Sequence, residues 1–299
     1  MSNFSFDLPE LGAEALRVIH GRGNCVPGAE AFNLEWLPPL ALIVAYEPLA
    51  EPVLAALLTR LQGDAAVKSI YLQQRDQPGA PVQWLWGEAQ TPSQITEHGL
   101  HYQVDIGTNQ NFGLFLDMAA GRQWVQQRAS GKTILNLFSY TCGFAVAALA
   151  GGAELVVNLD MSQAALNVGR NNLRLNQLDV KRAKFFAHDL FKSWGKLRKF
   201  GPYDLVIADP PSMQKGSFLV EKDYQRIVRQ LPSLLSDNGQ ALLCLNAPWL
   251  DQQFLLDCVA NEAPELRFVE ALARPDLVLE KDADAGLKVL LFERAAAVS

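Results

Sequence analysis

The chain has 299 residues, 49% of them hydrophobic, and a formal net charge of −6. It is long enough for two domains with buried cores, and its acidic balance does not favour a nucleic-acid partner. No apolar run reaches the roughly 18 residues of a membrane helix, which predicts no membrane partner. The four cysteines are scattered, which predicts reduced thiols in a cytoplasmic protein and no metal site. The sequence leaves the oligomeric state open.

Residues 1–100 predict a small α+β domain, which we expect to contribute to substrate binding. Strand-like runs at 41–46 and 69–72 flank a helical stretch at 52–61, and turns rich in proline and glycine separate further short strands. The second predicted domain covers residues 101–299.

From residue 133 onward, strand-like runs alternate with amphipathic helical stretches, such as 162–176 and 224–235. The predicted strands cover 134–138, 155–159, 183–187, 204–208, 241–245, 266–271 and 287–292. Strands separated by helices predict a mainly parallel sheet, and the last strand, which follows without a clear helix, is expected to insert antiparallel. This predicts an α/β fold with a seven-stranded, Rossmann-like methyltransferase domain.

The loop after the first of these strands reads Asn136-Leu-Phe-Ser-Tyr-Thr-Cys-Gly-Phe144 and leads into a helix. A strand, a tight loop and a helix N-terminus form a cradle of backbone N–H groups for a ligand. Dinucleotide enzymes use several glycines here to approach a pyrophosphate, whereas this loop has only Gly143. It therefore suits a ligand with a carboxylate or a ribose, such as S-adenosylmethionine.

Acidic residues follow the next two predicted strands. Asp160 is placed to accept hydrogen bonds from ribose hydroxyls, and Asp189 to accept one from an adenine amino group. The alternative is helix capping, by Asp160 or Ser162 in the first case and by Asp189 in the second.

The fourth predicted strand ends in Asp209-Pro210-Pro211-Ser212. Two prolines fix a stiff, extended corner, so that a carboxylate and backbone carbonyls are held at the carboxyl edge of the sheet. Such acceptors orient an amino group, although the same tetrapeptide can be an ordinary turn. Residues 170–229 around this corner contain thirteen Lys or Arg and six Asp or Glu, a net charge of +7. This zone is either a contact for phosphates or a set of solvated helix faces.

The chain resembles the bacterial methyltransferases of large-subunit ribosomal RNA, which include 5-methylcytosine and N7-methylguanine enzymes. The resemblance rests on the 136–144 loop, Asn158-Leu-Asp-Met-Ser162, Asn171-Asn-Leu-Arg-Leu-Asn176 and Asp209-Pro-Pro211. It implies S-adenosylmethionine as cofactor and ribosomal RNA as substrate. The cofactor residues that it implies are Phe138, Ser139, Tyr140, Gly143, Asp160, Asp189, Asp209, Asp117 and Arg122.

Among these residues, the loop positions would surround the methionine moiety and Asp209 would stand beside the methyl group. Asp117 and Arg122 would help to close over the cofactor. Asp209 and the Pro210 carbonyl are the expected catalytic groups, together with Asn246 as a further polar contact. The 5-methylcytosine members use a cysteine nucleophile where this chain has Asn246, and Cys244 is expected to be buried packing.

The sequence therefore predicts an S-adenosylmethionine-dependent enzyme that methylates a nucleobase nitrogen in ribosomal RNA. Two alternatives stay open, namely a protein or small-molecule N-methyltransferase and a non-catalytic relative that binds the cofactor or RNA. A nicotinamide dehydrogenase is the least favoured enzyme class.

Overall fold

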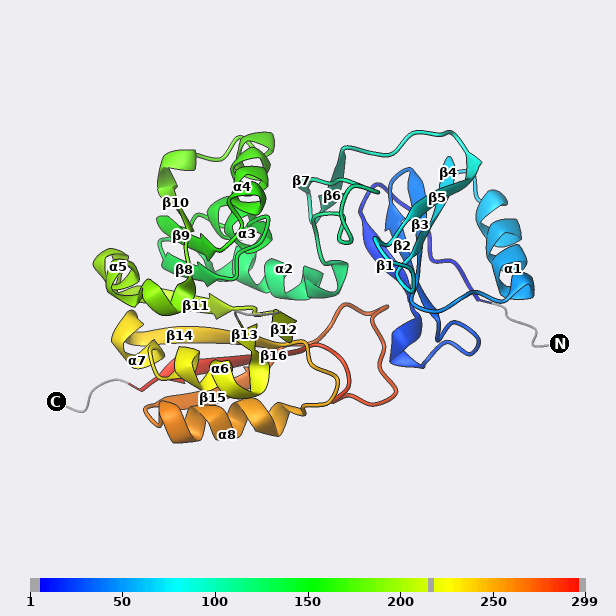
Figure 1. The fold of residues 1–299 in the computed structure, drawn as a ribbon. Coiled ribbons are helices and arrows are strands. Elements are labelled where there is room, and N and C mark those ends of the chain that lie inside the picture. Colours follow the sequence, from blue (N-terminus) through cyan, green and yellow to red (C-terminus); the bar gives the residue numbers. More distant parts are fainter. Residues whose placement is uncertain (1–5, 215–217, 296–299) are drawn as a thin grey trace. The chain divides into compact units, whose positions relative to one another are not determined.

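The computed structural model describes residues 6–214 and 218–295, and the chain divides into two compact units (Figure 1). Unit 1 comprises Met1–Ala119 and Arg274–Ala283, and unit 2 comprises Ala120–Ala273 and Asp284–Ser299. Unit 1 thus includes a short segment from near the C-terminus. The expected domain division at residue 100 stays a prediction, because compactness does not test whether each part folds by itself.

Unit 1 contains a five-stranded sheet in the order β1-β2-β3-β4-β5. Its strands are β1 (Leu16–His20), β2 (Phe32–Leu37), β3 (Leu40–Ala45), β4 (Ser69–Gln74) and β5 (Val82–Gly87). Only β3 and β4 pair in parallel, because helix α1 (Glu51–Gln62) connects them as a crossover. Val53, Leu57 and Leu61 of α1 are buried in the core of this unit. A separate hairpin pairs β6 (Gln94–Glu97) with β7 (Leu100–Gln103).

An ion-pair network is buried in unit 1. Arg17 contacts Glu35 at 2.8 Å and Asp117 at 3.2 Å, and the Glu35 side chain is only 2% exposed. His20 in turn lies 2.8 Å from Glu280, which belongs to the segment from near the C-terminus. Because side chains alternate along β2, Glu35 lies on the face opposite the apolar core. The network therefore fixes both Asp117 and the 274–283 segment within unit 1.

Unit 2 contains a seven-stranded sheet in the order β10-β9-β8-β11-β14-β16-β15. Its strands are β8 (Thr133–Leu137), β9 (Leu155–Asp160), β10 (Ala183–Ala187), β11 (Tyr203–Ala208), β14 (Leu235–Leu245), β15 (Leu266–Ala271) and β16 (Lys288–Arg294). Strand β16 pairs antiparallel with both β14 and β15, whereas β10, β9, β8, β11 and β14 pair in parallel. The predicted fold class is confirmed.

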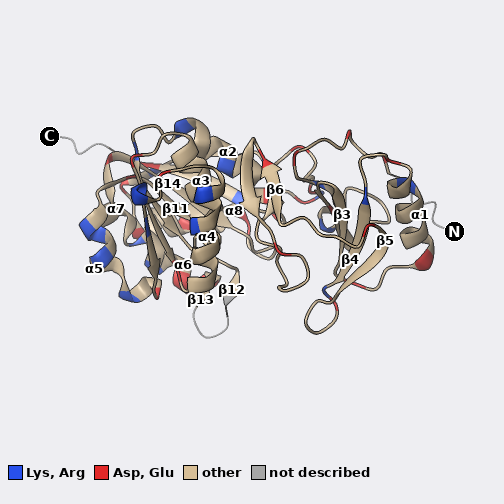
Figure 2. Cartoon of the chain, turned by 90° about the horizontal axis from the view of Figure 1, so that it is seen from above, with Lys and Arg blue, Asp and Glu red and all other residues tan. Residues whose placement is uncertain are grey.

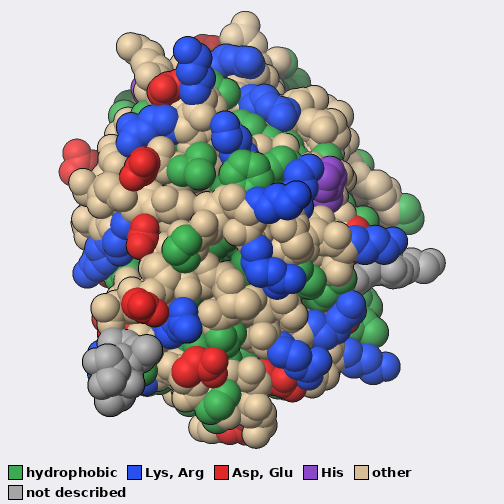
Figure 3. All heavy atoms as spheres, turned by 90° about the vertical axis from the view of Figure 1, so that its left-hand side faces the viewer, with side chains coloured by type: hydrophobic (Ala, Val, Ile, Leu, Met, Phe, Trp, Pro, Cys, Tyr) green, Lys and Arg blue, Asp and Glu red, His purple; other side chains and the backbone are tan. Residues whose placement is uncertain are grey.

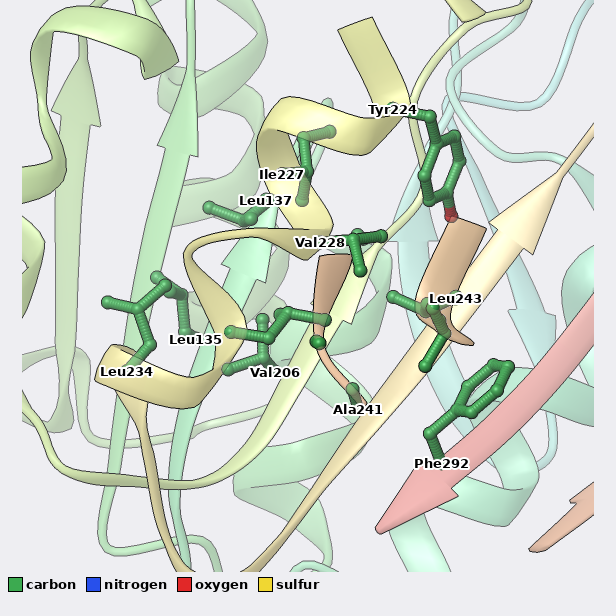
Figure 4. Packing of buried hydrophobic residues seen from close by; sticks show 14 of the residues in the cluster. Leu135, Leu137, Val206, Tyr224, Ile227, Val228, Leu234, Ala241, Leu243 and Phe292 are labelled. Carbon is green, nitrogen blue, oxygen red and sulfur yellow. The ribbon is translucent and has the colours of Figure 1, made fainter. Parts of the chain in front are cut away.

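Helices cover both faces of this sheet (Figure 1). They are α2 (Ala119–Arg128), α3 (Gly143–Ala150), α4 (Gln163–Leu175), α5 (Trp194–Leu197), α6 (Val220–Val228), α7 (Leu231–Leu234) and α8 (Gln252–Glu262). Alternate residues of β8, β11 and β14, such as Leu135, Val206 and Leu243, pack with Tyr224 and Ile227 of α6 (Figure 4). This packing gives the central strands a rigid support, so the loops at their carboxyl ends are well anchored.

Most boundaries agree with the prediction to within one or two residues, and two differ by more. The helix expected over 224–235 is divided into α6 and α7, and Pro232 lies in the first turn of α7, where a missing N–H is tolerated. Strand β14 begins at Leu235, before the expected residue 241, and its pairing with β11 shifts between Tyr203 and Leu205. A two-stranded hairpin, β12 (Met213–Gln214) with β13 (Phe218–Leu219), follows the proline corner. No helix in the described part of the chain is long and apolar enough to cross a membrane.

Candidate active site

The strand register aligns the predicted site residues at the carboxyl edge of the unit 2 sheet. Leu137 of β8 pairs with the residue before Asp160 on β9 and with the residue before Asp209 on β11. Phe138, Asp160 and Asp209 therefore come directly after this aligned row, at the carboxyl ends of three neighbouring strands. Because neighbouring strands are about 4.8 Å apart, the backbones of the two acids are separated by roughly 10 Å.

The loop after β8 has an unusual backbone. Phe138, Tyr140 and Cys142 have φ angles of 55°, 46° and 61°, so three non-glycine residues lie in the left-handed region. Each such residue costs about 1–3 kcal/mol, and this kind of strain is concentrated at functional sites. The loop is held by two backbone hydrogen bonds, from Ser139 N–H to Leu159 and from Cys142 N–H to Ser139. It leads directly into α3 at the predicted cofactor position.

Asp160 joins two loops of the site. One carboxylate oxygen accepts a hydrogen bond from the Tyr140 N–H at 2.8 Å, and the other accepts one from the Ser162 N–H at 2.8 Å. The Ser162 hydroxyl accepts from Ala165 N–H and is the N-cap of α4. Ser162 therefore caps the helix, and each Asp160 oxygen keeps a further lone pair for a ligand.

A buried hydroxyl in the loop fits a polar ligand. Ser139 is 6% exposed, and its Oγ has no oxygen or nitrogen partner among the described residues. Its neighbour is the thiol of Cys142, which is a weak hydrogen-bonding group. An unsatisfied buried hydroxyl costs about 1–3 kcal/mol, so a polar group of a bound ligand would stabilise this position.

Asp189 adopts the capping role that the sequence left open. Its side chain accepts a hydrogen bond from Phe191 N–H at 2.8 Å, at the start of the 3-10 turn η4 (Leu190–Lys192). The second carboxylate oxygen lies 3.7 Å from Lys192 Nζ. A role for Asp189 next to adenine stays a prediction.

The proline corner lies beside the end of β14. Asp209 is half-buried and Pro210 is buried, while Asn246 is exposed immediately after β14.

Cys244 is 0% exposed, which confirms that it is buried packing. Burial, and secondly the charge of Asp209, raise the pKa of the Cys244 thiol well above its ordinary value. Cys244 therefore stays protonated and is not suited to act as a nucleophile.

Two features of this edge were not predicted. Met161, next to Asp160, is 53% exposed, and its thioether offers an apolar surface to a flat ring. Phe138 and Phe191 both pack against Phe218 of β13, with ring-centroid distances of 5.3 Å and 6.4 Å. The sequence could have indicated Met161, because it is an apolar residue directly after the acid at the end of a strand. The aromatic contacts join three distant segments and had no local signal.

The other two predicted cofactor residues belong to different units. Asp117 lies in unit 1, where it accepts a hydrogen bond from Arg17 at 3.2 Å. Arg122 lies on α2 in unit 2 and is 4% exposed. The carboxyl edge of the unit 2 sheet thus gathers the 138–143 loop, Asp160, Asp189, Asp209 and Asn246. Closure over the cofactor by Asp117 and Arg122 stays a prediction.

The thiol of Cys142 is expected to make the free energy of unfolding dependent on pH. Burial raises the pKa of Cys142 from 9.0 to about 12. Between these values the unfolded thiol loses its proton and the folded one keeps it, so stability falls as pH rises above 9. We expect this residue to contribute up to about 1.4 kcal/mol of lost stability per pH unit. Urea unfolding at several alkaline pH values should show a shallower decline in Cys142→Ala than in the wild type.

The profile of the S-adenosylmethionine-dependent methyltransferase family matches residues 16–293 of this chain. A protein of Erwinia tasmaniensis named ribosomal RNA large subunit methyltransferase I is 33% identical over 272 residues, which cover 86% of this chain and 68% of that protein. The protein of the same name from Serratia proteamaculans is 32% identical over 277 residues, or 87% of this chain and 68% of its own length.

Solved structures show the same fold. A methyltransferase solved in complex with S-adenosylhomocysteine superposes with a TM-score of 0.84 at 24% identity, covering 95% of this chain and 76% of its own. The family match extends over both units and nearly the whole described sequence. This chain belongs to the family of S-adenosylmethionine-dependent methyltransferases.

Proposed function

We propose that this enzyme transfers a methyl group from S-adenosylmethionine to a nucleobase nitrogen in ribosomal RNA. The observation that supports this most is that Phe138, Asp160 and Asp209 lie at the carboxyl ends of three neighbouring strands, with the proline corner following Ala208. The relatives named as ribosomal RNA methyltransferases point to the same substrate class. The protonated, buried Cys244 favours nitrogen over cytosine C5 as the acceptor.

We assign the cofactor contacts from this geometry. The 138–143 loop would surround the methionine part, with the Ser139 hydroxyl as a polar contact. Asp160 would accept hydrogen bonds from the ribose, and Asp189 and Met161 would lie near the adenine. When bound, S-adenosylmethionine supplies an electrophilic methyl group on a positively charged sulfur.

The remaining task of the protein is to align the acceptor nitrogen with that methyl group. Well-aligned proximity can lower a barrier by up to about 7–11 kcal/mol. Asp209 and the Pro210 carbonyl would accept hydrogen bonds from N–H groups of the base, and Asn246 would add a polar contact. A base in a duplex would have to be flipped out, which costs a few kcal/mol. Ring N7 of guanine and an exocyclic amine are both suitable acceptors.

The deciding experiment is the transfer of labelled methyl from S-adenosylmethionine to ribosomal RNA from cells that lack this protein. Free RNA and large subunits should both be tested, with Asp209→Ala as the inactive control. Label in RNA only with the intact enzyme would support the proposal, and mass spectrometry of the digested RNA would identify the atom. Label in a ribosomal protein, or in neither component, would overturn it.

Asp160 provides a test of the cofactor site. Asp160→Ala removes the acceptor of the Tyr140 and Ser162 N–H groups as well as the proposed ribose contact. Hydrogen bonds to charged groups are worth about 1.5–3 kcal/mol, so we expect the Kd for S-adenosylhomocysteine to rise on the order of 30-fold. Isothermal titration calorimetry measures this directly.

The matched control is Ser162→Ala, which removes the N-cap of α4 two residues away. Loss of a cap costs about 1 kcal/mol of stability and should leave the Kd within about twofold. Equal losses of affinity in the two variants would mean that Asp160 acts only through the structure of the loop.

A further inference from the structure

A strongly basic surface lies on unit 2 and adjoins the proposed active site at Lys192, which lies 3.7 Å from Asp189. The segment 180–203 contains seven Lys or Arg and a single acid, Asp189. We define the basic edge as Lys181, Arg182, Lys184, Lys192, Lys196, Arg198 and Lys199. These residues lie on η3 (Val180–Arg182), on β10, which is the edge strand of the sheet, and on η4, α5 and η5 (Arg198–Phe200).

The figures show this concentration of charge. Blue Lys and Arg side chains gather on the side of the molecule that faces the viewer in Figure 3, and the ribbon in Figure 2 marks Lys and Arg positions in blue along α5. Lys184 and Lys196 are half-buried, and the other five residues are exposed. The side chains are therefore accessible to a partner on the surface of this unit.

Most cations of the basic edge lack a carboxylate partner. Within the described residues, only Lys192 pairs with an acid, Asp189 at 3.7 Å. Elsewhere in unit 2, three exposed arginines are neutralised by close ion pairs, namely Arg226–Asp223, Arg229–Glu262 and Arg267–Glu293. Uncompensated like charges on one surface repel one another, and a polyanion would relieve that repulsion.

Aromatic rings of the edge strand lie beneath Lys196 of the basic edge and beneath Arg170, a neighbouring cation on α4. The Arg170 guanidinium lies 4.4 Å from the centre of the Phe185 ring, and Lys196 Nζ lies 4.1 Å from that of Phe186. Phe200 packs against Phe186 at 5.4 Å, so η5 is held against β10. Lys196 and Arg170 are thus held against a rigid support, which reduces the entropy that these two side chains lose when they bind a ligand.

We propose that the basic edge binds the phosphate backbone of the RNA substrate. This inference rests on the proposed function. It adds a second contact with RNA, separate from the contact of the base with Asp209 at the proline corner. Phosphate contacts position a nucleic acid without reading its sequence, which fits lysines that have no rigid hydrogen-bonding partner. The local surface also explains how an enzyme with a net charge of −6 could bind RNA.

The test is the triple variant Lys181→Gln, Lys184→Gln, Lys199→Gln, which changes cations without a side-chain ion pair among the described residues. Binding of an unmodified transcript of large-subunit ribosomal RNA is measured at several salt concentrations. Each lost contact with a single strand removes about 0.7 from the slope of log K against log salt, so three remove about 2. At about 0.1 M salt, this corresponds to a Kd raised on the order of 100-fold.

The control variant Arg128→Gln, Arg229→Gln, Arg267→Gln removes the same charge from other exposed positions of unit 2 and should bind RNA as the wild type does. The triple lysine variant should also keep its Kd for S-adenosylhomocysteine and its kcat, with a raised KM for RNA. If the wild type methylates RNA but the triple lysine variant has the same RNA affinity and the same salt slope, the proposed phosphate contact at the basic edge is overturned and the proposed function stands. A wild type that neither binds nor methylates RNA would overturn both proposals.

A membrane is the competing partner for a basic surface. Vesicles containing phosphatidylglycerol distinguish the two classes of ligand. If the triple variant loses vesicle binding and keeps its affinity for RNA, the RNA contact is overturned.

Discussion

Replacement of Asp209 by Asn is expected to lower kcat for methyl transfer by about 10²-fold, the loss expected when an acceptor nitrogen is misplaced by about 1 Å. The carboxylate lies at the carboxyl end of β11, and Pro210 after it is buried, so the corner has little freedom to adjust. Asn keeps the size of the side chain and removes its charge and one acceptor. We expect the Kd for S-adenosylhomocysteine to change by less than about threefold, because a transition-state contact affects kcat.

A second carboxylate on the same strand provides the control. Asp204 lies near the amino end of β11, where it accepts hydrogen bonds from Thr133 N–H at 2.8 Å and from the Ser236 hydroxyl at 3.1 Å. Asp204→Asn should lower the free energy of unfolding by about 1 kcal/mol and leave kcat unchanged. Single-turnover transfer to RNA compares the two variants. A kcat for Asp209→Asn close to that of Asp204→Asn would contradict a role in the reaction.

Much of unit 2 could be predicted from the sequence because its strands are continuous apolar runs. Parallel strands covered on both faces have this character, and turns with Gly, Asn or Asp separate them from amphipathic helices. The strand-end acids followed from the same pattern, since each comes directly after such a run. Residues at the carboxyl edge of the sheet can therefore be identified from the sequence once the strands are predicted correctly.

Other features depend on contacts between distant segments and have no local pattern. The left-handed backbone at Phe138, Tyr140 and Cys142 lacks the glycines that normally indicate positive φ. The segment 274–283 lies between β15 and β16 in the chain but belongs to unit 1, where Glu280 contacts His20. Neither could be inferred from hydrophobic periodicity, which reports only which face of an element is buried.

Gly169, in the middle of α4, shows how a residue outside the loop determines the shape of the site. A glycine inside a helix costs about 1 kcal/mol relative to alanine, so its presence requires a reason. A Cβ at this position would lie 2.4 Å from the Sγ and 2.8 Å from the Cβ of Cys142. Both atoms are part of a buried residue in the strained loop, and they cannot move without displacing it.

We therefore expect Gly169→Ala to lower the free energy of unfolding by about 3 kcal/mol, at the upper end for overpacking, and to weaken S-adenosylhomocysteine binding. Urea unfolding and calorimetry measure the two effects. Gly169→Ala alone leaves two explanations, the clash with Cys142 and a general change in α4.

Cys142→Gly separates these explanations. It removes both clashing atoms and places glycine where φ is 61°, a conformation that glycine adopts without strain. The double variant Gly169→Ala, Cys142→Gly should recover most of the lost stability and cofactor affinity, so that the two substitutions are strongly non-additive. Additive losses would show that the contact between α4 and the loop does not determine the geometry of the cofactor site.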